Sequence, residues 1–456
     1  MEAKQEKQEL SLWETIKILF GASRAFWLIN LVNFGDGIAY FGVLTLLTRF
    51  LGDSIGMSDH VTGLSVSAFT GFVTLFMFGG GFVSDRCGVR KAITISLACL
   101  LGGRLALTLS PAFAAAAPLF AWAGLFAMAL GSGILQPALY AGIKEYTDER
   151  TATLGYGILY AIMNLGIVAE NFISPFVRSG EPFINTGSVH VMGLGWGING
   201  VFWLCTAITV IMFFTHVLCF TKKVDDACRQ CEAPSPEHKP SFWQSMKELP
   251  LTDPRFMFFI FILLPVRTLF AHQFLTIPDY VFRCFPEAVS AKFEWINGLN
   301  PFIIVIFVPL IAAMTRKVNV VTMMIIGTAL SAATSFLLAG APNLHMLILY
   351  VILFSLGEAI WSSRFLEYVA DIAPAGKVGG YMGLAGLPWF LAKFTTGLYS
   401  GTMLEKFIPK QGFQDPATLW LIYGIIACVS PLGLILARRW LVAPMNKKAS
   451  KADAGV

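Results

Sequence analysis

The sequence predicts an all-α membrane protein with twelve transmembrane helices in two six-helix bundles related by pseudo-twofold symmetry. Of its 456 residues, 56% are hydrophobic and only 13% are charged, whereas a typical soluble domain carries about 25% charged residues. Twelve apolar stretches are long enough to span a bilayer as helices, and one long polar stretch separates the sixth from the seventh. This composition argues against a soluble enzyme, a nucleic-acid binder and a disordered protein.

The expected spans are too long for strands, and the strands of a membrane barrel would alternate polar and apolar residues. We place them at about 26–50, 61–83, 92–109, 118–142, 154–177, 193–218, 256–277, 295–315, 320–339, 344–370, 380–402 and 417–437. With the N-terminus in the cytoplasm, 23 of the 33 Lys and Arg residues fall in cytoplasmic segments and five in external loops. Because positive charge marks the cytoplasmic side, we expect both termini there, in a plasma or inner membrane.

The long polar stretch divides the chain into two halves of similar length. The expected organisation is a cytoplasmic N-terminal segment (1–25), an N-terminal bundle (26–218), a cytoplasmic linker (219–255), a C-terminal bundle (256–437) and a cytoplasmic tail (438–456). In many transporters, two such halves rock against each other around a site at mid-membrane depth.

The linker contains two further patterns. Phe242, Trp243, Met246 and Leu249 have helical spacing, which predicts an amphipathic helix at the inner interface. Cys228 and Cys231 could hold a metal with His238, but a single pair is more typical of a solvated linker, so we expect no metal site.

The loop between the second and third spans is rich in glycine and charge. It carries Gly81, Asp85, Arg86, Gly88 and Arg90, a pattern that resembles the signature loop of the major facilitator superfamily. The glycines permit a tight turn, and Asp85 can accept hydrogen bonds from a helix N-terminus or a basic side chain. The resemblance implies a conformational latch. The alternative is an ordinary positively charged loop with turn glycines.

A narrower resemblance, to the proton-coupled oligopeptide transporter family, rests on motifs in helices 1, 5, 8 and 10. These motifs are Tyr40-Phe41-Gly42, Tyr160-x-x-x-Asn164, Asn300-Pro301 with Pro309, Gly357-Glu358, Ala373-Pro374 and Met382-Gly383. The resemblance implies a proton-coupled peptide carrier that binds a substrate's amino group at Glu358.

Several functional positions depart from that family. The family carries E-x-x-E-R on helix 1, where this chain has Asn33, Asp36 and Gly37. The lysine expected on helix 4 is Gln136, and the arginine after the tyrosine motif is Leu44. One of two coupling carboxylates and three cations are therefore missing, so the family's mechanism does not transfer unchanged.

Ionisable side chains within the spans are candidates for function, because burying them is costly. Asp36 and Arg267 lie at similar depth in equivalent helices, so we expect them either to pair across the cavity or to be solvated separately. Glu358 lies mid-depth with Trp361 on the same face, suited to an ammonium group, to a proton or to a structural ion pair. His272 could titrate near neutral pH or be a satisfied core residue.

We therefore predict a monomeric secondary transporter of a small, polar, amine-bearing solute such as a di- or tripeptide or an amino-acid-like compound. Glu358 and Trp361 would hold the cationic group, with hydrogen bonds from Asn33, Tyr40, Gln136, Tyr160 and Asn164. Asp36 or Glu358 would carry the proton, with Arg267 and His272 in coupling or gating. A proton gradient is the expected driving force, and no catalytic residue, metal or cofactor is expected.

Two alternatives stay open on the sequence alone. The same fold could export hydrophobic cations or metabolites, since the many aromatic residues suit such cargo. The missing helix 1 and helix 4 residues also fit a transporter-like sensor or scaffold that no longer moves a substrate.

Overall fold

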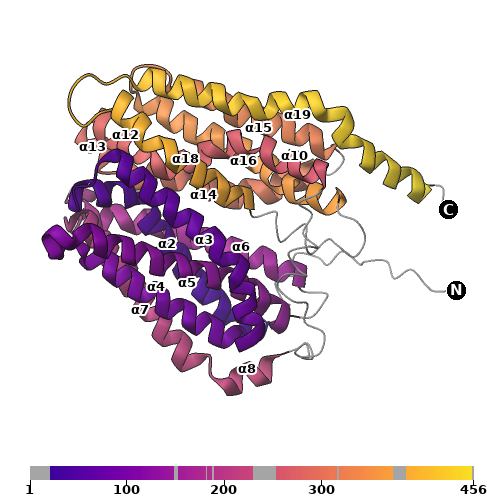
Figure 1. Ribbon diagram of the computed structural model, residues 1–456, viewed down its shortest axis with the longest axis horizontal. Helices are drawn as coiled ribbons and strands as arrows, with labels where there is room; N and C mark the ends of the chain where they lie inside the picture. The colour runs from indigo at the N-terminus through magenta and orange to yellow at the C-terminus, as the bar shows by residue number, and fades with distance from the viewer. Residues whose placement is uncertain are drawn as a thin grey trace.

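The N-terminal half of the computed structural model is a bundle of six long helices (Figure 1). The structure describes residues 21–147, 152–180, 182–186, 189–229, 253–315, 318–372 and 387–453. The elements of this half are α2 (Arg24–Arg49) with a π-helical turn (Phe50–Ser54), α3 (Asp59–Cys87), α4 (Val89–Leu109), a 3-10 segment (Ser110–Ala116), α5 (Ala117–Tyr146), α6 (Ala152–Arg178), α7 (Gly197–Cys219) and the short α8 (Lys222–Cys228).

The C-terminal half repeats this pattern with more breaks. Its elements are α10 (Pro254–Ile262), α11 (Leu264–Leu275), α12 (Ile277–Cys284), α13 (Glu287–Ser290), α14 (Phe293–Met314), α15 (Val320–Thr334) with a 3-10 turn (Ser335–Leu338), α16 (Leu344–Ile372), α18 (Leu387–Phe407) and α19 (Pro416–Asp453). The helices α10 and α11 form one span bent by 40°. Pro265 lies in the first turn of α11, and proline is a common cause of such a break.

Within the described residues, these helices match the twelve expected spans in order. The criteria of helix length and apolar composition alone identify eight spans, or nine with the bent pair. They count α4 and α5 as a single span, and α14 and α18 do not meet them. One element was not expected: Pro182–Thr186 (β1) pairs antiparallel with Val189–Met192 (β2) between α6 and α7. The amphipathic linker helix and Cys231 lie outside the described residues.

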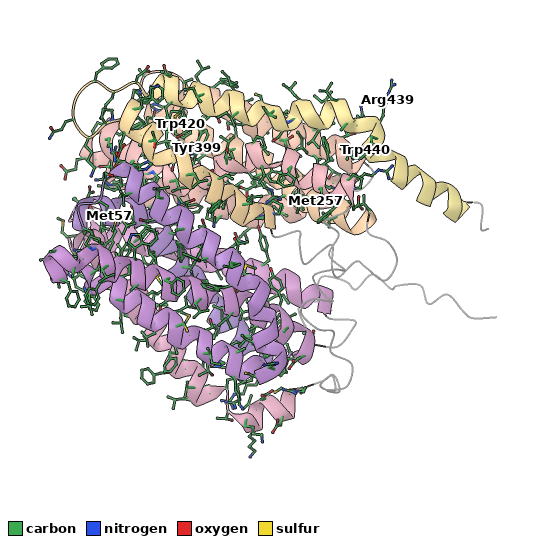
Figure 2. All side chains as sticks on the ribbon, viewed as in Figure 1. Met57, Met257, Tyr399, Trp420, Arg439 and Trp440 are labelled. Carbon is green, nitrogen blue, oxygen red and sulfur yellow. The ribbon has the colours of Figure 1, made fainter. Side chains whose placement is uncertain are left out.

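The two bundles lie close together at one end of the molecule and diverge toward the other (Figure 1). We call the first end, where α12 and α13 lie, the α12 end; Met57 marks it in Figure 2. The second is the linker end, where α8 and the end of α19 lie, with Met257 and Trp440 beside it. The halves meet through α3 with α18, α6 with α14 and α2 with α11.

Local sequence accounts for several helix boundaries. The hydroxyl oxygens of Ser23 and Ser58 accept hydrogen bonds from the first turns of α2 and α3, and Asn319 caps α15 in the same way. Gly88 separates α3 from α4 at φ +79°, a conformation that favours glycine. The tight turn expected at this loop is therefore present.

Candidate functional site

A chain of ion pairs joins the two halves at the α12 end. Arg283 on α12 forms a two-pronged pair with Asp59 on α3, with nitrogen–oxygen distances of 2.7 and 2.8 Å. It also donates to Asp279 at 2.8 Å, and Asp279 in turn accepts from Arg49 of α2 at 3.3 Å. These side chains are at least 85% buried, so salt screens their attraction weakly.

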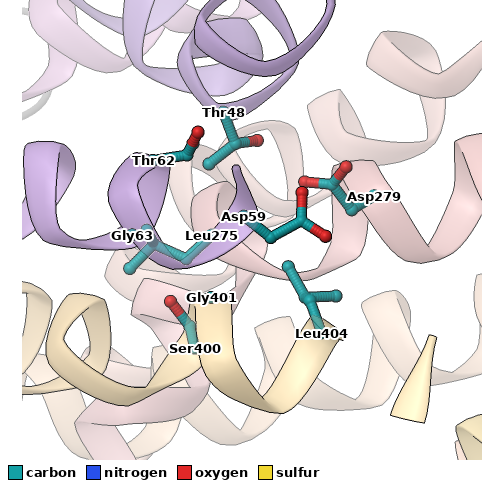
Figure 3. A pocket seen from close by; sticks show the side chains of 9 residues that line it. All are labelled: Thr48, Asp59, Thr62, Gly63, Leu275, Asp279, Ser400, Gly401 and Leu404. Atoms are coloured by element: carbon teal, nitrogen blue, oxygen red, sulfur yellow. The ribbon is translucent and has the colours of Figure 1, made fainter. Parts of the chain in front are cut away.

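A small pocket lies beside these ion pairs (Figure 3). Its lining comes from both halves: Thr48, Asp59, Thr62, Gly63, Leu275, Asp279, Ser400, Gly401 and Leu404. The helices α3 and α18 pack closely at this pocket, since a side chain at Gly401 would collide with the backbone of Asp59. Small residues commonly allow such close approach between membrane helices.

A third contact at the same end joins α6 to α14. Arg178 donates from Nε to Glu294 at 2.5 Å and from Nη2 to the other carboxylate oxygen at 2.6 Å. It also donates to the backbone oxygens of Ser290 and Ala291. At the linker end, by contrast, the ion pairs of Asp225 with Arg90 and Arg229 stay within the N-terminal half. The α12 end is therefore closed by charges that cross between the halves.

Inside the N-terminal half, Asp36 of α2 forms a buried ion pair with Arg104 of α4. Arg104 donates from Nη2 to Asp36 at 2.8 Å and from Nη1 to Thr209 of α7 at 2.6 Å. The expected pairing of Asp36 with Arg267 is thus wrong for this conformation, because Arg104 on a neighbouring helix already neutralises the carboxylate. The alternative of two separately solvated charges is also wrong, since Asp36 is 5% exposed and Arg267 is 3% exposed.

Inside the C-terminal half, the charges are arranged differently. Glu358 of α16 is 5% exposed, and among the described residues it accepts one hydrogen bond, of 2.9 Å, from the side-chain amide of Asn300 on α14. The same amide nitrogen donates to Ser355 at 3.0 Å. Sequence motifs identified Asn300 as a family feature but not as the partner of Glu358. The amide donor carries no net charge, and no ion pair among the described residues places a cation in contact with this carboxylate.

Arg267 of α11 lies against aromatic rings. The carbon of its guanidinium is 4.5 Å from the ring centre of Phe365, 4.9 Å from that of Trp361 and 5.4 Å from that of Trp389. Its Nε and Nη1 are buried and make no hydrogen bond within the described ranges of the chain. Glu358 acts on it electrostatically, although no ion pair among the described residues joins the two. The structure thus places Arg267 beside the expected substrate residues rather than opposite Asp36.

Four further expected substrate residues, Asn33, Gln136, Tyr160 and Asn164, lie in the N-terminal half. Tyr160 of α6 is 45% exposed, and α6 packs against α14, the helix whose Asn300 bonds to Glu358. Asn164 donates to the backbone of Tyr160, and Asn33 donates to the backbone of Leu159 at 2.6 Å. The amide of Asn164 therefore bonds within α6, and that of Asn33 joins α2 to α6. Gln136 is half-buried on α5.

Tyr40 contributes to a cage of four aromatic rings around the ammonium of Lys393. Lys393 of α18 is 7% exposed, and its Nζ lies 5.6 Å from the ring centre of Tyr40. The rings of Phe41, Phe270 and Phe274 lie at 5.6 to 5.9 Å. Two of these rings come from each half. The sequence marked Lys393 as a charge within a span but gave no indication of this cage.

His272 has the surroundings of a core residue. Its Nδ1 is 2.7 Å from the hydroxyl of Thr276, and its Nε2 is 3.1 Å from that of Tyr399. The ring stacks on Tyr423 with ring centres 3.7 Å apart, in the aromatic cluster that Tyr399 and Trp420 mark in Figure 2. Both ring nitrogens are satisfied, which favours the structural interpretation over a gating role.

The loop expected to act as a latch is only partly described. Gly81 lies within α3 and Gly88 forms the turn, while the side chain of Asp85 lies outside the described part. Nε of Arg90 is 3.7 Å from the carboxylate of Asp225 in α8, which ties this loop to the start of the linker. Arg86, in the last turn of α3, has an exposed side chain that also has an interaction partner.

Comparison with known proteins identifies relatives for this architecture. The family model described as Major Facilitator Superfamily matches residues 29–283, more than half of the chain. Dipeptide and tripeptide permease A of Erwinia pyrifoliae is 21% identical over 494 aligned positions, covering 96% of this chain and 97% of the permease. The uncharacterized MFS-type transporter YqjV of Bacillus subtilis is 22% identical, covering 73% of this chain and 74% of its own.

Solved transporter structures share the fold. A peptide transporter POT in complex with sulfate superimposes with a TM-score of 0.70 at 15% identity, covering 93% of this chain and 96% of its own. A nucleoside transporter, NupG, gives a TM-score of 0.71 at 12% identity, with 91% and 99% covered. The helical architecture of the described residues and the family match agree, and the chain belongs to the major facilitator superfamily.

Proposed function

We propose that the protein is a secondary active transporter of a small, polar, amine-bearing solute, of the di- or tripeptide or amino-acid type, coupled to proton movement. The observation that carries the proposal is Glu358, a buried carboxylate whose one hydrogen bond within the described part of the chain comes from the neutral amide of Asn300. A buried carboxylate without a cation in contact is costly, and a substrate ammonium or a proton would relieve that cost. Similarity to di- and tripeptide permeases supports the same substrate class.

In the proposed cycle, the structure represents the state closed to the outside. We assign the α12 end to the outer face, because the expected loops there hold five Lys and Arg residues, whereas the expected cytoplasmic segments hold 23. Separating Arg283 from Asp59 and Arg178 from Glu294 would open that face. Glu358 would then bind the amine or a proton and release it after the halves rock back.

A thermal-shift screen of the purified protein, at pH 5.5 and pH 7.5, tests the substrate class. Dipeptides and amino acids should raise the melting temperature, and saturable counterflow of the same compounds should follow in proteoliposomes. Stabilisation by unrelated lipophilic cations without competition from dipeptides would instead support the exporter of hydrophobic cations. Binding without counterflow of any compound would support a non-translocating sensor.

A second measurement tests proton coupling. Uptake into proteoliposomes should accelerate when the lumen is made more alkaline than the outside, because the proton then enters with the solute. An uptake rate that does not change with the pH gradient would contradict proton coupling but not the proposal of solute transport.

A further inference from the structure

We propose that Arg267 binds a carboxylate of the transported solute, so that Arg267 and Glu358 together select zwitterions from one half of the protein. The inference rests on the proposed function, because it takes Glu358 as the amine site. It goes further by assigning the anion site to a helix 7 arginine, whereas the resembling family has cations on helices 1 and 4.

The first observation is the unused hydrogen-bonding capacity of Arg267. The side chain is 3% exposed, and its buried Nε and Nη1 make no hydrogen bond with any residue that the structure describes. A guanidinium carries five N–H donors, and leaving buried donors unpaired is costly. An acceptor from outside the protein would satisfy them.

The second observation is what surrounds the guanidinium. The rings of Phe365, Trp361 and Trp389 lie 4.5, 4.9 and 5.4 Å from its central carbon. Ring faces stabilise a cation through their quadrupoles but offer no oxygen acceptor for its N–H donors. The rings therefore stabilise the positive charge of Arg267, and the paired N–H donors that suit a carboxylate receive no acceptor from them.

The third observation is the relation between Arg267 and Glu358. Each acts electrostatically on the other, yet among the described ion pairs none brings their charged atoms within 4 Å. One small molecule carrying an ammonium and a carboxylate could contact both groups. Trp361, one turn from Glu358 on α16, packs against Arg267 and links the two positions.

The other cations within the spans are less suited to this role. Arg104 is held by Asp36 and Arg49 by Asp53 and Asp279. Arg364 donates to Thr315. Lys393 is the main competitor, because its described contacts are aromatic rings. The two candidates lie near the same ring pair, since Phe270 contacts Lys393 and packs edge-on against Trp389 at 4.4 Å.

The test measures binding of three probes to the full-length protein in detergent: L-alanyl-L-alanine, its C-terminal amide and its N-acetyl derivative. The amide lacks the carboxylate and the acetylated form lacks the ammonium. We compare the wild type with Arg267→Gln, and with Arg267→Lys in case the first variant does not fold. Arg255→Gln is the matched control, because Arg255 also stacks on a tryptophan, Trp440, but at the linker end.

The expected result has two parts. The wild type and Arg255→Gln bind the free dipeptide at least tenfold more tightly than the amide. Arg267→Gln loses that preference by weakening for the free dipeptide alone, and Arg267→Lys retains part of it because the charge stays while the fork is lost. The acetylated probe, which tests Glu358, should bind weakly to every variant.

Other outcomes overturn the assignment in distinguishable ways. Equal binding of dipeptide and amide by the wild type would refute a carboxylate site while leaving the amine site standing. A preference that persists in Arg267→Gln and disappears in Lys393→Gln would move the anion site to the aromatic cage. If none of the probes binds the wild type, or if acetylation has no effect, the proposed function fails and this inference fails with it.

Discussion

The charges of Asp36 and Arg104 in the N-terminal half and those of Glu358 and Arg267 in the C-terminal half are held in opposite ways. In the N-terminal half, Asp36 and Arg104 form a direct pair that Thr209 completes. In the C-terminal half, Glu358 accepts a hydrogen bond from a neutral amide. Arg267 lies against three aromatic rings. A closed pair stabilises a bundle, whereas separated charges with spare bonding capacity suit a ligand. The difference suggests that the N-terminal pair is structural and that the C-terminal charges do the binding.

The largest expected effect comes from breaking the N-terminal pair. Asp36→Asn leaves Arg104 buried with no counter-charge, which should cost about 3–5 kcal/mol of stability. The melting temperature of the purified variant measures this loss. A double variant, Asp36→Asn with Arg104→Met, should recover most of it because the uncompensated charge is gone. An unchanged melting temperature in the single variant would show that the pair contributes no stability.

A smaller effect, on binding rather than stability, is expected from Glu358→Gln. The new amide oxygen can still accept the hydrogen bond from Asn300, so the melting temperature without ligand should stay near that of the wild type. Affinity for an amine-bearing solute should fall about 10- to 100-fold, because a charge-assisted contact contributes about 1.5–3 kcal/mol. A large loss of stability with unaltered affinity would reverse the roles assigned to the two halves.

The contacts between the halves provide the next test. Arg283→Gln removes both prongs of the pair with Asp59, so the α12 end should open more often, by about tenfold, or about 1.4 kcal/mol. A cysteine placed at Thr62, in the adjacent pocket, should then react faster with a membrane-impermeant maleimide in an otherwise cysteine-free protein. Arg255→Gln, at the opposite end, serves as the control. Equal labelling rates would mean that these ion pairs do not hold the end closed.

The smallest effect is expected at the aromatic cage. Lys393→Met removes a buried cation whose described contacts are rings, and a methionine side chain can occupy similar space against them. Stability should change by less than about 1 kcal/mol, because the lost cation–π attraction is offset by the relief of burying a charge. The melting temperature measures this. A loss as large as that of Asp36→Asn would reveal a counter-charge for Lys393.

The sequence predicts the fold far better than the site. Apolar length and loop charge identify the twelve spans because the bilayer imposes them on each helix separately. Partners across helices depend instead on how each helix is rotated and offset against its neighbours, which hydropathy does not encode. Equal depth in equivalent helices favoured Arg267 as the partner of Asp36. In the structure, Asp36 instead pairs with Arg104 on a neighbouring helix.

The candidate site could be predicted in part for the same reason. Glu358, Trp361 and Arg267 stand out as polar or charged groups within apolar helices, a local signal. The cage around Lys393 and the network from Arg49 to Asp59 draw on residues hundreds of positions apart, and several of these lie near helix ends, where charge is ordinary. Asn33 illustrates the same limit, because the sequence gives no indication that its amide donates to the backbone of Leu159 on α6.

Uptake of L-alanyl-L-alanine into proteoliposomes, with and without an inside-alkaline pH gradient, tests most directly the claim that the C-terminal charges carry substrate and proton. The wild type should respond to the gradient. Glu358→Gln should lose that response, while the double variant of Asp36 and Arg104, once folded, should keep it. A Glu358→Gln protein that responds as strongly as the wild type, or a double variant that folds but ignores the gradient, would contradict the account.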